Sequence, residues 1–91
     1  MRELDEFLEM FGGFFSKKEL AEITEAWEED ECRNAYVLGV WDRDPRRAAS
    51  PVRRDLIQWL DAHPDRWAKE FEEATGYRVG LDQALSFPEN N

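Results

Sequence analysis

The chain has 91 residues, of which 42% are hydrophobic and 36% charged, and its formal net charge at pH 7 is −9. This length predicts a single domain, and the hydrophobic share excludes a disordered chain. The single Cys32 excludes an internal disulfide framework, and the lack of a signal peptide or of an apolar run near the roughly 20 residues that span a bilayer indicates a cytoplasmic protein without a membrane partner.

The first segment has the pattern of an amphipathic helix. Four apolar residues recur at the i, i+3, i+4, i+7 spacing of one helical face: Leu4, Phe7, Leu8 and Phe11. Gly12 follows, and glycine readily enters the left-handed conformation that often ends a helix. We therefore predict a helix over residues 2–11 that ends at a left-handed Gly12.

A second helix has a complete start signal. Ser16 can cap the helix, and Glu19, three residues later, completes a capping box. Phe15 and Leu20 occupy the two positions of a hydrophobic staple. An apolar stripe follows, which predicts a helix over residues 17 to about 31, and its members are Leu20, Ile23, Ala26 and Trp27.

Residues 35–41 allow two interpretations, because a run of seven apolar residues fits either a buried strand or a buried helix. Asn34 offers a helix cap, whereas Gly39 weakens a helix by up to about 1 kcal/mol relative to alanine. We favour a helix whose shared face is formed by Tyr36, Val37, Val40 and Trp41. The alternative is a two-stranded element that pairs residues 36–41 with residues 77–79.

The second half of the chain alternates loops and helices. Residues 42–50 have the pattern of a loop, because Pro45 disfavours helix at the residue before it. Ser50 can cap a helix over residues 51–62, with Pro51 at its first position. Pro64 can begin a further helix, which Gly76 ends.

The C-terminal tail can form one more short helix, capped by Gly80 or Asp82, before residues 88–91 fray. Its apolar residues are Leu81, Ala84, Leu85 and Phe87. All connections are short, as in a helical bundle. We therefore predict an all-α fold, a single domain over residues 1–91 with four to five short helices, and keep an α+β fold with the two-stranded element at 36–41 and 77–79 as the alternative.

The negative charge is concentrated in the first third of the chain. Residues 1–31 hold eleven carboxylate and three basic side chains, so the remaining residues carry a net charge of about −1. Residues 19–31 contain no base, and like charges at helical spacing repel by a few tenths of a kcal/mol per pair. Five carboxylates lie off the apolar stripe of this helix and are candidate partner-binding residues: Glu19, Glu22, Glu25, Glu28 and Glu29.

This acidic face has two interpretations. Acids three or four residues apart lie about 4.5 to 6 Å apart along a helix axis, so the face could imitate a row of phosphates. It could also be a solvated surface that keeps a small protein soluble. We favour the functional interpretation, in which the face occupies a basic surface of a partner protein.

Five arginines gather in the segment from Arg43 to Arg54, interspersed with aspartates. Arginine suits phosphate recognition, so a small nucleic-acid-binding regulator that uses this segment is the second hypothesis. The alternative is that these arginines pair with the acidic helices inside the molecule. The aspartates dilute the positive field and no glycine-rich phosphate loop follows, so we do not expect direct nucleic-acid binding.

Aromatic residues supply the core and two candidate anchors. Trp27, Trp59 and Trp67 lie on predicted apolar faces and are assigned to the core. Trp41 ends its segment beside a charged residue, so we expect it to be partly exposed. Trp41 and Phe14 are therefore candidate partner-binding anchors, because aromatic residues are enriched at binding hot spots.

No catalytic, cofactor or metal site can be assembled from the sequence. His63 is the only histidine and Cys32 the only cysteine, which leaves no ligand spacing for zinc and no Cys–His nucleophile. A calcium loop starting at Asp42 fails, because Arg47 and Arg53 occupy the positions where it needs glycine and an acid. We expect no enzyme and no cofactor, and His63 at a helix junction.

Size and charge together predict a small acidic protein-binding module. We expect a stoichiometric inhibitor of the phage anti-host or anti-defence, immunity or antitoxin type, which mimics nucleic acid on a basic partner such as a nuclease or a nucleic-acid-binding protein. Size and charge are the support for this expectation, because the sequence contains no motif of such an inhibitor. A helical assembly or adaptor subunit, and with it a homo-oligomer, is the third alternative.

Overall fold

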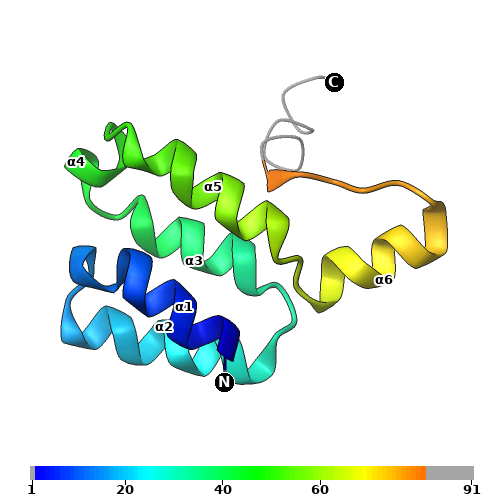
Figure 1. The fold of residues 1–91 in the computed structure, drawn as a ribbon, viewed down its shortest axis with the longest axis horizontal. Helices are drawn as coiled ribbons and strands as arrows, with labels where there is room; N and C mark the ends of the chain where they lie inside the picture. Colours follow the sequence, from blue (N-terminus) through cyan, green and yellow to red (C-terminus); the bar gives the residue numbers. More distant parts are fainter. Residues whose placement is uncertain (1, 82–91) are drawn as a thin grey trace.

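The computed structural model describes residues 2–81, and this range forms helices without strands (Figure 1). The all-α prediction is confirmed, and the two-stranded alternative at 36–41 and 77–79 is wrong. The predicted tail helix and the frayed residues 88–91 lie outside the described residues. The elements in chain order are α1 (Arg2–Phe11), the 3-10 helix η1 (Gly12–Phe14), α2 (Lys17–Glu29), α3 (Arg33–Trp41), α4 (Pro45–Ala48), α5 (Val52–Ala62) and α6 (Arg66–Thr75).

The predicted capping box at the start of α2 is confirmed. The Ser16 hydroxyl accepts from the Glu19 N–H at 3.1 Å, and the Glu19 carboxylate accepts from the Ser16 N–H at 3.0 Å. The helix ends at Glu29, earlier than predicted, because Asp30 turns left-handed with φ of 50°. Gly12 is not left-handed, since the chain continues from α1 directly into η1, so that prediction is wrong.

Two boundaries in the middle of the chain correct the sequence prediction. Asn34 lies inside α3 rather than capping it, since the helix already begins at Arg33. Residues 45–48, predicted as loop, form the short helix α4. Asp44 is extended and accepts from the Arg46 N–H at 2.9 Å, so it caps a helix that starts at Pro45.

α5 begins at Val52, one residue later than predicted, so Pro51 is the residue before the helix rather than its first residue. The Ser50 hydroxyl accepts from the Val52 N–H at 3.1 Å. His63 lies at the end of α5, where its position at a helix junction is confirmed.

The ends of α6 are set by a carboxylate and a glycine. The helix begins at Arg66 rather than at Pro64, because Asp65 caps it by accepting from the Ala68 N–H at 3.0 Å. Gly76 ends it, as predicted, in the left-handed conformation with φ of 79°. Residues with a Cβ are strained in that conformation, so glycine suits this position.

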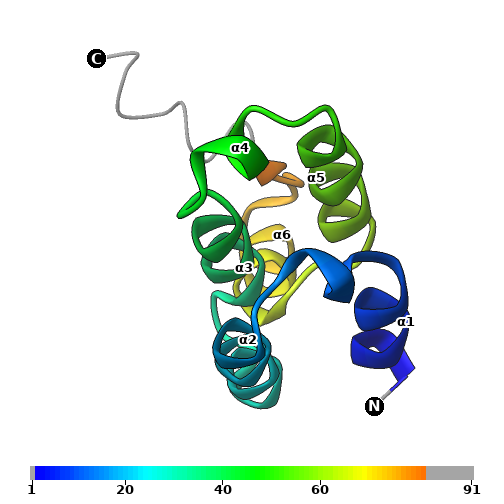
Figure 2. The ribbon, with the colours of Figure 1, turned by 90° about the vertical axis from the view of Figure 1, so that its left-hand side faces the viewer.

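α2 packs against α3, and α3 packs against α5. α1 lies across the core from α2, below α5 in the view of Figure 2. The core between them consists largely of aromatic rings: the centroid of the wholly buried Phe7 ring lies 5.0 Å from that of Trp27 and 5.5 Å from that of Trp59. These contacts confirm Trp27 and Trp59 as core residues. Burial of a phenylalanine contributes about 1.5–3 kcal/mol, so these rings dominate the stability.

Two tryptophans differ from the sequence prediction in how far they are buried. Trp41 is wholly buried, and its indole N–H donates to the Arg47 carbonyl at 2.7 Å, so the expectation of partial exposure is wrong. Trp67, assigned to the core, is 44% exposed. The reason is that α6, which carries Trp67, stands apart from the other helices (Figure 1) and buries none of its residues.

Candidate functional site

The last three carboxylates of α2 lie outside because the opposite stripe of the helix is in the core. Ile23 and Trp27, four residues apart, are buried, while Glu25, Glu28 and Glu29 are exposed. The last turn of α2 contains no basic residue. Its acids therefore lie at the negative end of the helix dipole, where cations rather than anions are stabilising.

Glu19, the first of the five candidate carboxylates, forms an internal ion pair. Its two oxygens accept from Arg47 Nη1 at 3.0 Å and from Arg47 Nη2 at 2.9 Å. Both side chains are largely buried, with 15% and 11% of their surfaces exposed. The hydrogen bond from Arg47 lowers the pKa of Glu19 to about 2, and the same pair raises the pKa of Arg47. Glu19 therefore serves the fold, and its charge is already neutralised.

Arg47 uses its whole guanidinium group inside the protein. Besides the two bonds to Glu19, Nε donates to the Trp41 carbonyl at 3.0 Å, Nη2 to the Val40 carbonyl at 2.9 Å, and Nη1 to the Phe14 carbonyl at 2.8 Å. These bonds account for all five N–H donors of an arginine. The side chain thus joins η1, α2, α3 and α4.

Two further arginines of the 43–54 segment also make internal ion pairs. Arg43 donates to Glu22 at 2.8 Å, which raises the pKa of Arg43, and Arg53 makes a two-pronged contact with Asp42 at 2.9 Å for each prong. The interpretation that the arginines pair with the acidic helices inside the molecule is confirmed for Arg47, which contacts Glu19, and for Arg43, which contacts Glu22. Arg46 and Arg54 lie exposed on the surface.

A groove lies between α2 and the start of α3, and we call it the acidic groove. Its volume is about 320 Å³. Glu25, Glu28 and Glu29 form no ion pair with any residue in the 2–81 range, and Glu25 and Glu29 line the groove. The full lining is Glu22, Glu25, Ala26, Glu29, Glu31, Cys32, Arg33 and Tyr36. An open groove with several carboxylates and one aromatic ring can hold a cationic side chain.

Sequence reasoning missed two members of the acidic groove. Tyr36 was predicted on the apolar face of its helix, but it is 41% exposed and turns toward α2. Glu31 belongs to the acidic run, and its place in the groove follows from the turn at Asp30, which no local pattern predicts. The one sequence signal for the place of Tyr36 in the groove was that a tyrosine stood at the edge of an apolar stripe.

Of the two predicted aromatic anchors, one is exposed and the other is buried. Phe14 is 47% exposed and its ring packs edge-on against Trp41, with centroids 5.2 Å apart. Trp41 lies beneath it and has no exposed surface. Phe14 lies near Glu19 through Arg47, at the other end of α2 from Glu28 and Glu29. The structure therefore does not bring the anchors and the exposed acids into one patch.

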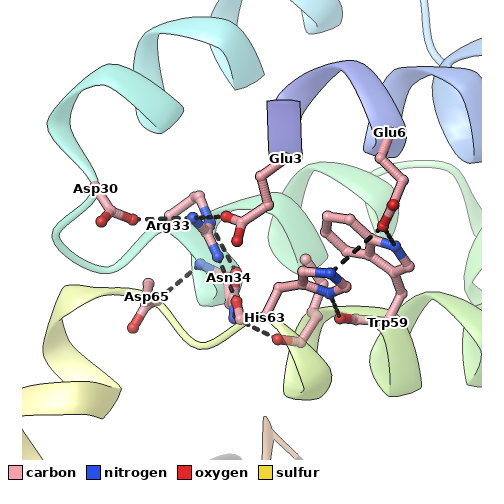
Figure 3. Close-up of polar contacts among 9 residues, drawn as sticks. Glu3, Glu6, Asp30, Arg33, Asn34, Trp59, His63 and Asp65 are labelled. Carbon is pink, nitrogen blue, oxygen red and sulfur yellow. Dashed lines mark hydrogen bonds and ion pairs between the residues drawn. The ribbon is translucent and has the colours of Figure 1, made fainter. Parts of the chain in front are cut away.

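A buried polar cluster that the sequence did not single out joins α1, α3 and the α5–α6 turn (Figure 3). Arg33 is 3% exposed and donates to Glu3 at 2.8 Å, to Asp30 at 3.0 Å and to the His63 carbonyl. Its guanidinium carbon lies 4.4 Å from the centroid of the Trp27 ring. Apart from Asn34 of the same helix, whose Oδ1 accepts from Arg33 Nε at 3.0 Å, these partners lie on other elements or turns, so helical periodicity gives no signal for them.

Asn34 and Asp65 complete this cluster (Figure 3). The Asn34 amide donates to the Leu60 carbonyl at 2.8 Å, and its backbone N–H donates to Asp65 at 2.9 Å. The same carboxylate caps α6. The direction in which α6 leaves the other helices is thus fixed by buried hydrogen bonds.

His63 ties α5 to α1. Its Nδ1 lies 2.8 Å from the Trp59 carbonyl, its Nε2 lies 3.4 Å from Glu6, and its ring stacks on Trp59 with centroids 3.9 Å apart. The Trp59 indole N–H donates to the same Glu6 carboxylate at 2.9 Å (Figure 3). These contacts are structural, since they hold α1 and the end of α5 together.

Within residues 2–81 no group of three or more His, Cys, Asp or Glu side chains is placed to hold a metal ion, and no helix of that range is long and apolar enough to cross a membrane. Comparison of the chain with protein-family models, with curated proteins and with solved structures gives no match. A functional interpretation therefore depends on the geometry of the acidic groove.

Proposed function

We propose that the protein is a stoichiometric binding module of the inhibitor type, which acts by occupying a basic surface of a partner protein. The supporting observation is the set of exposed carboxylates at the end of α2, Glu25, Glu28 and Glu29, which have no ion-pair partner in the described chain. They repel one another and oppose the helix dipole, which costs a few tenths of a kcal/mol for each pair. A cationic partner would offset that cost.

The acidic groove supplies the specific contact in this proposal. A lysine or arginine side chain of the partner would enter between Glu25 and Glu29 and lie against the exposed Tyr36 ring. Carboxylates pair with such cations, and the aromatic face attracts them further. The remaining negative surface accelerates the encounter with a basic partner.

The partner class that fits this chemistry is a nuclease or another nucleic-acid-binding protein. Such proteins present arginines and lysines at the spacing of phosphates, and the exposed acids of α2 recur three and four residues apart. We therefore propose an inhibitor of the immunity, antitoxin or phage anti-host type. The proposal assigns the protein to the cytoplasm, where the exposed Cys32 thiol stays reduced.

The test compares two triple variants with the same change in charge. Glu25→Gln/Glu28→Gln/Glu29→Gln alters the candidate site, and Asp5→Asn/Glu9→Gln/Asp55→Asn removes three exposed carboxylates of α1 and α5. Binding of an oligo-arginine peptide is measured by calorimetry at two salt concentrations. We expect the α2 variant to bind at least about tenfold more weakly than the control variant, because only it loses the groove contacts.

Amide chemical shifts in the same titration locate the peptide. Shifts centred on Tyr36 and Glu29 support the proposal. Equal weakening by both triple variants, with shifts spread over the surface, would mean that only bulk charge acts, and the proposed site would be wrong.

The nucleic-acid-binding alternative has less support. Arg43, Arg47 and Arg53 already contact carboxylates of the same chain, so few cations of that segment are left for phosphates. Retention of the protein on duplex DNA or RNA at low salt, weakening as salt rises, would favour this alternative over the inhibitor.

A further inference from the structure

α6 carries an apolar stripe that the described part of the molecule leaves open. Trp67, Phe71 and Ala74 follow one another at i, i+4 and i+7, and none of them is buried. The Trp67 and Phe71 rings stack on each other with centroids 5.3 Å apart. Tyr77, directly after the helix, is 73% exposed. The apolar stripe of an amphipathic helix normally packs against another element, so the exposed rings of α6 form a candidate interface.

A charged stripe runs beside the apolar one. Arg66, Glu70 and Glu73 also stand at i, i+4 and i+7, each one residue before a member of the apolar stripe. The positive charge lies in the first turn and the negative charges lie further along. This order is opposite to the preference of the helix dipole, which favours acids at the start and bases at the end. An isolated α6 gains nothing from this order.

We propose that two copies of the chain pair through antiparallel α6 helices. In a twofold-symmetric pair each apolar stripe covers the other, and the same flank of both helices meets along the edge. Antiparallel alignment then sets Arg66 of one copy against Glu73 of the second copy, at both ends of the contact. The charges at the two ends, which oppose the dipole of one helix, become complementary in two, although the same alignment brings the two Glu70 side chains near each other at the centre.

The charge of this region favours a second copy over a strongly charged partner. Residues 66–78 contain three bases and three acids, while the chain as a whole carries −9. α6 is therefore locally neutral, so two copies meet less repulsion there than over the acidic first third of the chain. The internal contact of Arg66 with Glu31 is long, at 3.7 Å, and both side chains are exposed, so Arg66 is accessible to a second copy.

The surface lies on a different helix from the acidic groove, so the proposal does not depend on the proposed function. Its test is a charge exchange followed by sedimentation velocity across roughly 1 µM to 1 mM protein, the range of weak association. Arg66→Glu sets two acids against each other at both ends of the contact, and Glu73→Arg sets two bases against each other there. Each single change should weaken the wild-type dimer at least about tenfold.

Two combinations should restore the dimer. Arg66→Glu/Glu73→Arg in one chain exchanges the two charges. In an equimolar mixture of the single variants, the two acids of the Arg66→Glu chain face the two bases of the Glu73→Arg chain, so both ends of the heterodimer again pair an acid with a base. Trp67→Ala/Phe71→Ala should abolish the dimer, whereas Met10→Ala, an exposed apolar residue of α1, should leave it unchanged. Circular dichroism melting verifies that each variant is folded.

A wild-type protein that stays monomeric over the whole range overturns the proposal. A dimer that persists in the single variants, or that the double exchange does not restore, also overturns it, because the helices then do not meet in the antiparallel arrangement. Restoration by the double exchange supports it, since neither unfolding nor bulk charge could produce that result.

Discussion

Arg47 makes the largest set of polar contacts of any single side chain in the described structure. Its five N–H groups meet the Glu19 carboxylate and three backbone carbonyls, and its guanidinium carbon lies 5.0 Å from the centroid of the Phe15 ring. Loss of any one contact leaves a covered acceptor without its donor, which costs about 1–3 kcal/mol. The residue therefore joins the first and second halves of the chain.

Arg47→Lys should destabilise the protein by about 2–4 kcal/mol, because lysine keeps the charge but has three donors and no planar fork. Urea unfolding at neutral pH measures the change. Arg54→Lys, at an exposed position of α5, is the matched control and should alter the free energy of unfolding by less than about 0.5 kcal/mol. Equal effects of the two substitutions would contradict the role of the fork.

At the scale of elements, α3 contains a glycine that the helix does not need. Gly39 lies in the interior of α3, is exposed, and has open space where a Cβ would stand. Gly39→Ala should stabilise the protein by about 0.5–1 kcal/mol, because alanine restricts the unfolded chain without a clash. Thermal unfolding measures this gain.

Gly76→Ala is the contrasting substitution for the same experiment. It also meets open space, but its φ of 79° is unfavourable for alanine, so we expect a loss of about 1–2 kcal/mol. If both substitutions changed stability in the same direction, backbone conformation would not explain the difference.

Local signals predicted most of the elements. The capping box at Ser16, the apolar stripe that contains Ile23 and Trp27, and the glycine at 76 each depend on neighbours in the sequence, and each appears in the structure. α4 was missed because Pro45 has two meanings: it excludes helix at the residue before it, and it also favours the first position of a helix.

The contacts that join distant segments could not be predicted from neighbouring residues in the sequence. The exposure of Trp67 depends on where α6 points, which Arg33, Asn34 and Asp65 decide across three elements. In the candidate site, the exposed acids of α2 were predicted from the stripe they avoid. Their division into a neutralised end at Glu19 and an exposed end was not, because it depends on Arg47, 28 residues away in sequence.

At the scale of the whole molecule, the acidic first third is partly neutralised by arginines from the second half. Glu19 shows the effect on stability, since Arg47 lowers the pKa of Glu19 from 4.5 to about 2. A carboxylate whose pKa is lowered by folding stabilises the protein fully above its unfolded pKa, and this contribution is lost as the pH falls through the folded pKa.

The free energy of unfolding should therefore fall as the pH decreases from about 4.5 to 2, with up to about 3 kcal/mol attributable to Glu19. Chemical unfolding at a series of pH values measures the slope. Glu19→Gln should be less stable at neutral pH and should show a shallower slope in this window. Glu28→Gln, an exposed acid of the same helix, should keep the wild-type slope, and a wild-type slope in Glu19→Gln would contradict the assignment.

The first backbone amides of α6 have one further consequence. The N–H groups of Arg66 and Trp67 donate to the carbonyls of Asp30 and Glu31, just beyond the end of α2, at 3.2 and 3.0 Å. α6 is thus anchored at its first turn, while its later turns contribute no buried side chain. The chain is held again at the buried Leu81, whose N–H donates to Asp61 at 3.0 Å. In a single copy we therefore expect the later turns of α6, between these two anchors, to open at a lower free energy than global unfolding.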